Sequence, residues 1–264
     1  MHLDKPHRHG EPLSREASLE RLSSTRFDVI VVGGGINGAV SALSLSAHGL
    51  KVALVEADDF ASGTSQESSN MIWGGFKYLE SYDIRLVAGL CRSRNRLAAA
   101  YPTRILETRF MAVLEQGAPF APWFAALGAN AYWGLGRLHT ERPRHRSRPT
   151  IRRLEPAVEA SQIRGGVEYS DYLLADNDSR FVSEFVIDAE QHGAVVANYL
   201  KLVSADLRDG AWNLTLCDRS TDSTFEADAR VFVNAAGPRL PEIGTLAGSE
   251  TESHLVFSKG VHLT

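Results

Sequence analysis

Residues 27–38 have the sequence FDVIVVGGGING. The six residues before the first glycine are mostly β-branched, which is typical of a strand buried on both faces. The glycines at positions 33, 35 and 38 then give the spacing GxGxxG. A helix is predicted over residues 39–48, and a second buried strand over 51–56 ends in an acid. The order strand, glycine turn, helix, strand and acid predicts a Rossmann-like dinucleotide-binding unit.

Each part of this motif has a physical role. Gly33 permits the tight turn, Gly35 lets a pyrophosphate approach the backbone, and Gly38 lets the helix pack closely on the strand. The N-terminus of the helix supplies free N–H groups for the diphosphate, and Ile36 and Asn37, just before the predicted helix, are further candidate contacts. Glu56 is placed to accept hydrogen bonds from the adenosine ribose, and an acid there repels a 2′-phosphate, which disfavours NADP.

Composition and charge set further limits. Hydrophobic residues make up 44% and charged residues 23% of the 264 residues, as in ordinary globular proteins of one or two domains. The net charge of −4 argues against a nucleic-acid partner. Cys91 and Cys217 are isolated, which favours free thiols in a reducing compartment. Residues 1–26 are polar and carry no secretion signal, so they are expected to be a mobile leader. The alternative is a short helix in this segment, with one face made by the leucines at 13, 19 and 22. No metal site is predicted.

The segment after the acid favours FAD over a nicotinamide cofactor. Residues 58–80 form a long run of small hydroxyl residues and glycines, which offers many hydrogen bonds to a second phosphate and a ring. A strand over 229–233 ends in NAAGP, where a backbone of small residues can lie against a cofactor. The further candidate FAD contacts are Ser62, Thr64, Ser65, Ser69, Trp73, Gly74, Gly75, Ala236 and Gly237.

The remaining segments predict a second layer. Strands are expected over 109–115, 167–171, 194–203, 212–217 and 225–233, and helices over 84–99 and 178–192. In the helix over 84–99 the leucines at 86, 90 and 97 are expected to pack inward. Its arginines, at 85, 92, 94 and 96, are expected to form a solvated face, with phosphate steering as the alternative. Residues 117–136 are uncharged and aromatic, but two prolines and four glycines exclude a transmembrane helix. Seven arginines follow, so this region predicts either a packed hairpin with a basic loop or contact with an anionic membrane surface.

Taken together, the chain resembles the FAD-dependent glycerol-3-phosphate dehydrogenases, within the glutathione-reductase-like and D-amino-acid-oxidase-like flavoproteins. The motifs that carry the resemblance are GGGING, DDFASGTS, GGFKYLE, EYSDYLLADNDSRFV, VNAAGP and SKGVHL, all in the family's order over about residues 27–264. The resemblance implies an α/β fold, with a Rossmann-like FAD-binding domain built on a parallel sheet and an incomplete antiparallel, β-rich substrate domain. The core would span 27–108 and about 165–240, and the substrate-side segments 109–164 and 241–264, with the C-terminal half of the family fold absent.

The resemblance also implies chemistry. A secondary alcohol such as sn-glycerol 3-phosphate would give a hydride to N5 of FAD, and the electrons would pass to a quinone or another acceptor. It places Val203 beside the adenine, Lys77, Tyr78 and His262 as catalytic candidates, and Lys77 and Lys259 on the substrate side. Such an enzyme would be cytoplasmic, or peripheral on the inner face of the cell membrane.

This sequence departs from the family at four positions. Asn70, Trp73, Lys77 and Arg239 stand where the family usually has lysine, histidine, arginine and tryptophan. The alternatives are an FAD-dependent amine or amino-acid oxidase of the same fold, a truncated, non-catalytic dinucleotide-binding protein, for which the stop after Thr264 is the sequence feature, and, least favoured, a nicotinamide dehydrogenase.

Overall fold

The computed structural model describes residues 13–249. This part of the chain forms two units. Unit 1 holds the residues up to Ser69 and those from Asn177 onward, and unit 2 holds Asn70–Asp176. These limits differ from the expected borders at 108 and 165, because residues 70–108 supply β3 (Met71–Ile72) and α3 (Ile84–Ala100), which pack with the strands of unit 2. The expected substrate-side segment 241–249 instead packs on the sheet of unit 1.

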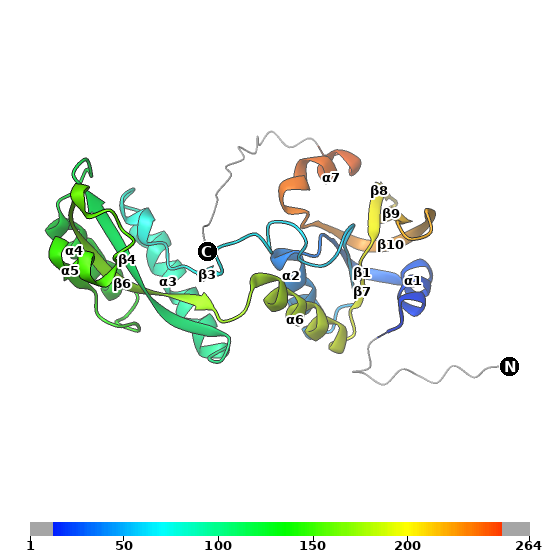
Figure 1. Ribbon diagram of the computed structural model, residues 1–264. Helices are drawn as coiled ribbons and strands as arrows, with labels where there is room; N and C mark the ends of the chain where they lie inside the picture. Colours follow the sequence, from blue (N-terminus) through cyan, green and yellow to red (C-terminus); the bar gives the residue numbers. More distant parts are fainter. Residues whose placement is uncertain (1–12, 250–264) are drawn as a thin grey trace. The chain divides into compact units, whose positions relative to one another are not determined.

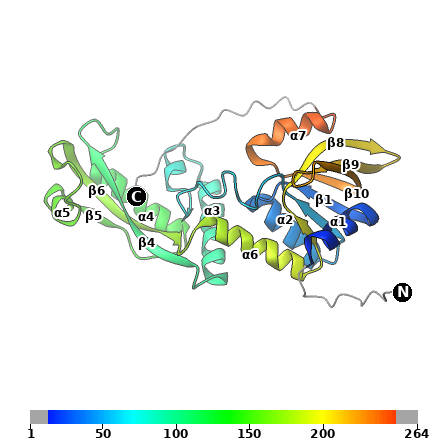
Figure 2. The same cartoon turned by 45° about the vertical axis from the view of Figure 1, so that its right-hand side comes forward.

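Unit 1 is built on a six-stranded, mostly parallel sheet, sheet A, with the order β7-β2-β1-β10-β9-β8. Strands β7, β2, β1 and β10 run parallel, while β8, β9 and β10 form an antiparallel meander. Helices α2 and α6 lie side by side against it (Figures 1 and 2). Its elements are α1 (Arg15–Ser24), β1 (Arg26–Val32), α2 (Ile36–Ala47), β2 (Val52–Val55), α6 (Asp178–Gln191), β7 (Val195–Ala197), β8 (Leu200–Arg208), β9 (Ala211–Asp218), β10 (Ser223–Asn234), η3 (Gly237–Arg239) and α7 (Leu240–Leu246).

Strand β1 is buried on both faces, as its composition predicts. Ile30 and Val32 join one large apolar cluster with residues of the meander and with Leu22 of α1. On the other side of the sheet, Leu54 of β2 lies against α2 beside Gly38. Because both faces of the strand are covered, its apolar side chains are removed from water, and this burial stabilises unit 1.

Helix α1 corrects the expectation of a mobile leader. Ser14 caps the helix by accepting a hydrogen bond from the Ala17 amide at 3.2 Å. Leu22 is fully buried, and Arg15 forms an ion pair with Asp218 of β9 at 2.9 Å. The leucine spacing therefore makes the helical face that was the alternative interpretation. Residues 1–12 lie outside the described part of the chain.

The strand expected over 194–203 is two strands. Strand β7 pairs with β2, whereas β8 pairs with β9 at the other end of the sheet order. Between them Tyr199 takes a left-handed conformation, with φ of 55°, and turns the chain. Its next neighbour, Leu200, donates its amide to the Glu56 carbonyl at 2.7 Å. The meander thus begins beside the end of β2, and this brings β8 next to the glycine turn.

Unit 2 contains an antiparallel sheet, sheet B, with the order β3-β6-β4 and with β5 paired to β6. Helices α3 and α4 pack against it (Figure 1). The core between them includes Val87, Cys91, Tyr132, Val167 and Tyr169. Its elements are β3 (Met71–Ile72), η1 (Phe76–Leu79), α3 (Ile84–Ala100), β4 (Ile105–Glu115), α4 (Pro122–Leu135), β5 (Arg144–Arg146), α5 (Arg148–Leu154), η2 (Ala160–Gln162) and β6 (Ile163–Leu174).

The uncharged aromatic segment is helix α4 rather than a packed hairpin. Pro122 stands in its first turn, where a missing amide costs nothing. The helix has 14 residues, fewer than the roughly 20 needed to span a bilayer. Throughout residues 13–249, no helix combines the length and the hydropathy that crossing a membrane requires.

Helix α3 buries a different face from the one expected. Its buried residues are Val87, Cys91, Arg94 and Ala98, while Leu86 is exposed. Arg94, expected on a solvated face, is only 3% exposed, whereas the other three arginines of the helix do face solvent. The fold class is otherwise as predicted: an α/β unit on a mostly parallel sheet, and a second unit on an antiparallel sheet.

Candidate functional site

The turn that follows β1 has the geometry that GxGxxG predicts. Gly33 has φ of 113°, and a Cβ there would lie 2.5 Å from the Ala235 carbonyl oxygen. A Cβ on Gly38 would overlap the Gly33 carbonyl oxygen. Because the neighbours in both cases are backbone atoms, neither position has room for a side chain. The turn therefore lies tightly between the ends of β1 and β10 and the first turn of α2.

Glu56 follows the end of β2 and faces this turn. Its Oε2 accepts a hydrogen bond from the Gly34 amide at 2.6 Å, and its Oε1 accepts one from the Asp58 amide at 2.9 Å. A carboxylate has about four lone-pair positions. Two backbone amides therefore fix its orientation and leave acceptor capacity for a ligand that donates two hydroxyls, such as a ribose.

One backbone amide at the N-terminus of α2 has a hydrogen-bond partner within the chain. Gly35 is the N-cap and provides no side chain to accept a hydrogen bond. The Ile36 amide donates to the Ser65 hydroxyl at 3.0 Å. A Cβ on Gly35 would meet only the Ser65 side chain within 4 Å. Ser65 therefore belongs to the turn region, and it is the side chain that a Cβ on Gly35 would approach.

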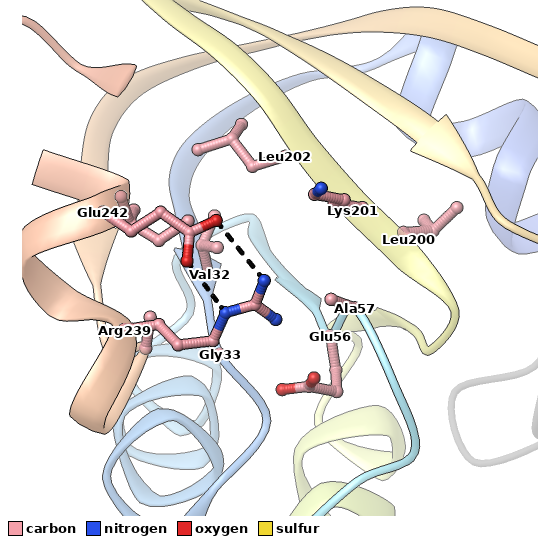
Figure 3. A pocket seen from close by; sticks show the side chains of 11 residues that line it. Val32, Gly33, Glu56, Ala57, Leu200, Lys201, Leu202, Arg239 and Glu242 are labelled. Carbon is pink, nitrogen blue, oxygen red and sulfur yellow. Dashed lines mark hydrogen bonds and ion pairs between the residues drawn. The ribbon is translucent and has the colours of Figure 1, made fainter. Parts of the chain in front are cut away.

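A pocket lies between this turn, the end of β2, the start of β8 and the η3–α7 segment (Figure 3). All of these elements belong to unit 1. The lining residues are Val32, Gly33, Glu56, Ala57, Leu200, Lys201, Leu202, Ala236, Arg239, Glu242 and Ile243. Of the candidate cofactor residues, Gly33, Glu56 and Ala236 thus meet in one pocket.

Val203 lies beside that pocket, on β8. The pairing of β8 with β9 shifts between Leu202 and Ser204, so Val203 stands at an irregularity with no residue opposite it. Such bulges leave backbone groups outside the ladder and are common next to binding sites. This is consistent with the backbone contact to adenine that the family resemblance implies for Val203.

The turn after β10 is held by Asn234. Its side-chain amide donates to the Leu240 carbonyl at 2.9 Å, and its Oδ1 accepts from the Ala236 amide at 3.2 Å. Gly237 follows with φ of 55°, in the left-handed region that favours glycine. The hydroxyl residues Ser62, Thr64 and Ser69 belong to unit 1 but do not line the pocket.

Five further candidate site residues lie in unit 2, namely Trp73, Gly74, Gly75, Lys77 and Tyr78. Gly74 and Gly75 form a turn, with φ of 86° at Gly75, that leads into η1. Lys77 and Tyr78 are exposed on η1, and the Tyr78 ring packs against Trp73 with 5.3 Å between ring centroids. The remaining two candidates, Lys259 and His262, lie outside the described residues.

A buried ion pair fixes the Gly74–Gly75 turn. Arg94 and Asp171 are almost completely buried, with 2.6 Å between Nη1 and Oδ1. Asp171 also accepts hydrogen bonds from the Tyr132 hydroxyl at 2.9 Å and from the Gly74 amide at 3.2 Å. A Cβ on Gly74 would overlap the Tyr132 hydroxyl. The turn thus lies directly on the polar network.

Burial shifts the pKa values of two groups in this network, the Asp171 carboxyl and the Tyr132 phenol. Burial raises the pKa of the Asp171 carboxyl, and the bonds to Arg94, Tyr132 and the Gly74 amide oppose this effect. Burial also raises the pKa of Tyr132, so the phenol stays protonated and donates. Sequence reasoning missed this network. The signal was the spacing of Val87, Cys91, Arg94 and Ala98, which puts Arg94 on an apolar helix face.

Within the described residues no cluster of His, Cys, Asp and Glu side chains is arranged to hold a metal ion.

Residues 28–264 match the model of a family described as DAO: FAD dependent oxidoreductase. The chain belongs to this family of FAD-dependent oxidoreductases. The resemblance inferred from the motifs is therefore confirmed, and the family's cofactor is FAD.

Individual members of the family give a finer comparison. This FAD-dependent oxidoreductase is 32% identical over 254 residues to the aerobic glycerol-3-phosphate dehydrogenase of Staphylococcus haemolyticus, covering 95% of this chain and 45% of that protein. It thus spans less than half the length of that relative. The X-ray structure of the glycerol-3-phosphate dehydrogenase from Bacillus halodurans complexed with FAD is similar with a TM-score of 0.67 and 25% identity, over 88% of this chain and 38% of that one.

The fold is shared more widely. The glycine oxidase from Geobacillus kaustophilus is similar with a TM-score of 0.59 at 19% identity, over 85% of this chain and 59% of that one. At this identity the likeness shows the fold alone, so it does not by itself favour the amino-acid oxidase alternative.

Proposed function

We propose that this chain forms the FAD-binding part of a dehydrogenase that oxidises a secondary alcohol such as sn-glycerol 3-phosphate. The observation that carries the proposal is the pocket at the carboxyl ends of β1 and β2, where Gly33 and the fixed Glu56 carboxylate meet. Ligands of parallel α/β sheets bind at such strand ends. The relative and the solved structure named as glycerol-3-phosphate dehydrogenases support the substrate class.

The residues present fit a dinucleotide. Gly33 and Gly38 leave no space for a Cβ, which keeps the turn close to the start of α2. We propose that the turn, including the amides of Gly35, Ile36 and Asn37, holds the diphosphate, and that Glu56 holds the ribose. When bound, FAD supplies the two-electron acceptor that the oxidation requires. The other proposed contacts are Ser62, Thr64, Ser65, Ser69, Trp73, Gly74, Gly75, Val203, Ala236 and Gly237.

On the substrate side we propose Lys77 and Tyr78. Both are exposed on η1, directly after the glycine turn that the buried network fixes. An ammonium group attracts a phosphate as a point charge, so Lys77 would favour an anionic alcohol over a neutral one. Lys259 and His262 are proposed on the family resemblance, as a substrate contact and a catalytic residue. A quinone or another acceptor would receive the electrons.

Anaerobic mixing of the FAD-loaded chain with sn-glycerol 3-phosphate tests this function. We expect the oxidised flavin band to bleach with this alcohol and to persist with glycine or secondary amines. Bleaching by amino acids, with hydrogen peroxide released in air, would instead favour the oxidase alternative. Bound flavin that no substrate bleaches would leave the chain a non-catalytic dinucleotide-binding protein.

We also propose a peripheral contact with an anionic membrane surface through α4 and the arginine-rich segment that follows it in the sequence. Trp123 and Leu127 on α4 are 68% and 59% exposed, and Phe124 stacks on Phe120 beside them. The exposed arginines that follow are Arg137, Arg142, Arg144, Arg148, Arg152 and Arg153. Apolar side chains next to arginines suit an interface with anionic lipid.

Sedimentation with phosphatidylserine vesicles tests this contact. Trp123→Ala with Leu127→Ala is expected to reduce vesicle binding at least severalfold, because it removes most of the exposed apolar surface of α4. The matched control is Leu207→Ala, a similarly exposed leucine on β8. Equal binding by both variants and the unsubstituted chain would contradict the proposal.

A further inference from the structure

Arg239 lies in the pocket of unit 1 without a role in the function proposed above. It ends η3, and its side chain extends toward the middle of the ring of lining residues, between Glu242 and Glu56 (Figure 3). Its Nε and Nη2 donate to the two carboxylate oxygens of Glu242 at 3.1 and 3.3 Å. This two-pronged bond holds one edge of the guanidinium and therefore fixes its plane.

The other charges near Arg239 are also acidic. Its Nη1 is 4.0 Å from an Asp58 carboxylate oxygen. Hydrogen bonding to Glu242, with the nearby charges of Asp58 and Glu56, raises the pKa of Arg239, so the group remains a cation. Asp58 also pairs with Arg219, which partly neutralises that carboxylate. Arg239 is thus a cation with three acids around it, and Lys201 is a second cation in the pocket lining.

Part of the pocket lining is apolar. Leu202 and Ile243 both line the pocket, and both belong to the buried core of unit 1. A guanidinium bonded along one edge keeps its two flat faces free, and such a face stacks well on aromatic rings. An apolar wall together with a planar cation is the environment that a flat, electron-rich purine base prefers.

We propose that Arg239 binds the adenine base of the dinucleotide through the flat face of its guanidinium, and that Glu242 is the positioning residue that sets this plane. The inference rests on the proposed FAD-binding function and adds the residue that recognises the base. A contact of this kind is expected to contribute about tenfold in affinity. This stacking contact recognises the adenine base, and its contribution to affinity does not depend on the phosphates of the ligand.

Three substitutions at one position separate stacking from charge. Arg239→Ala removes both, Arg239→Lys keeps the charge without the plane, and Arg239→Trp keeps a plane without the charge. Binding of FAD, ADP and adenosine to the full chain is measured by calorimetry at low and high salt. Arg230→Ala is the matched control, since Arg230 is an exposed arginine on β10 that lies outside the pocket.

If Arg239 stacks on adenine, Arg239→Ala and Arg239→Lys both weaken all three ligands about tenfold, and Arg239→Trp restores most of the affinity. Glu242→Gln gives a smaller loss for the same three ligands. The inference is wrong if Arg239→Lys binds all three ligands normally, since the charge without the guanidinium plane is then enough. It is also wrong if adenosine binding does not change while that of ADP falls, since this result assigns the side chain to the phosphates.

The two proposals can fail separately. If the unsubstituted chain binds neither FAD nor ADP, the proposed function is wrong and the role of Arg239 falls with it. If the unsubstituted chain binds both and Arg239→Ala binds them equally well, only the role of Arg239 is wrong. Circular dichroism of each variant shows whether a loss of affinity reflects a loss of fold.

Discussion

Replacing Gly38 by alanine is expected to destabilise unit 1 by about 3 kcal/mol or more. The added Cβ would overlap the Gly33 carbonyl oxygen, and both atoms belong to rigid backbone between β1 and α2. The helix can accept it only by moving off the sheet, which separates α2 from Leu54. We expect the midpoint of thermal unfolding to fall by roughly 6–12 °C.

Two other glycines provide the controls. Gly63→Ala should leave stability unchanged, because nothing lies within 4 Å of a Cβ there. Gly35→Ala should fold, because its Cβ would approach only the Ser65 side chain, with the hydroxyl at 3.0 Å, a group that can rotate. This variant should nonetheless bind FAD at least tenfold more weakly, because the methyl group lies where the diphosphate would approach. Equal stability of Gly38→Ala and Gly63→Ala would show that the close approach of Gly38 to Gly33 does not hold the turn.

Replacing Asp171 by asparagine is expected to cost about 3–5 kcal/mol, because it leaves the Arg94 cation buried without its counter-charge. The same change weakens the bonds that Asp171 accepts from Tyr132 and from the Gly74 amide. The glycine turn before η1 should therefore loosen together with the core of unit 2. Urea unfolding of the variant and the unsubstituted chain measures the difference.

An exposed pair in the same unit is the matched control. Glu141 and Arg144 are 3.3 Å apart, and both side chains are more than half exposed. Glu141→Gln should change stability by less than about 1 kcal/mol, because solvent screens such pairs. If Asp171→Asn costs no more than Glu141→Gln, the buried pair does not stabilise unit 2.

The part of the site that sequence predicts best is the part that is local. Strand β1, the glycine turn, α2 and Glu56 follow one another within about thirty residues, and each has a specific local signal. Turn geometry and strand burial are determined by neighbours in the chain. The close packing at Gly33 and Gly38, and the place of Glu56 directly after β2, could therefore be predicted from the sequence alone, whereas the hydrogen bond from the Gly34 amide to Glu56 was not predicted.

The parts that could not be predicted depend on distant contacts. Arg94 and Asp171 are 77 residues apart, and a lone arginine in a helix is usually solvated. Arg239 and Glu242 have the spacing of a helical ion pair, but only the path of β8 past the end of β2 shows that they line the pocket of unit 1. The break at Tyr199 creates that path, and no proline or glycine marks it.

The central claim is that this chain holds FAD through the pocket of unit 1. The most direct measurement is an absorbance spectrum of the chain after gel filtration with added FAD, beside the same experiment with Glu56→Ala. We expect flavin bands that elute with the unsubstituted chain and are strongly reduced for the variant. A folded, flavin-free protein in both experiments would contradict the claim.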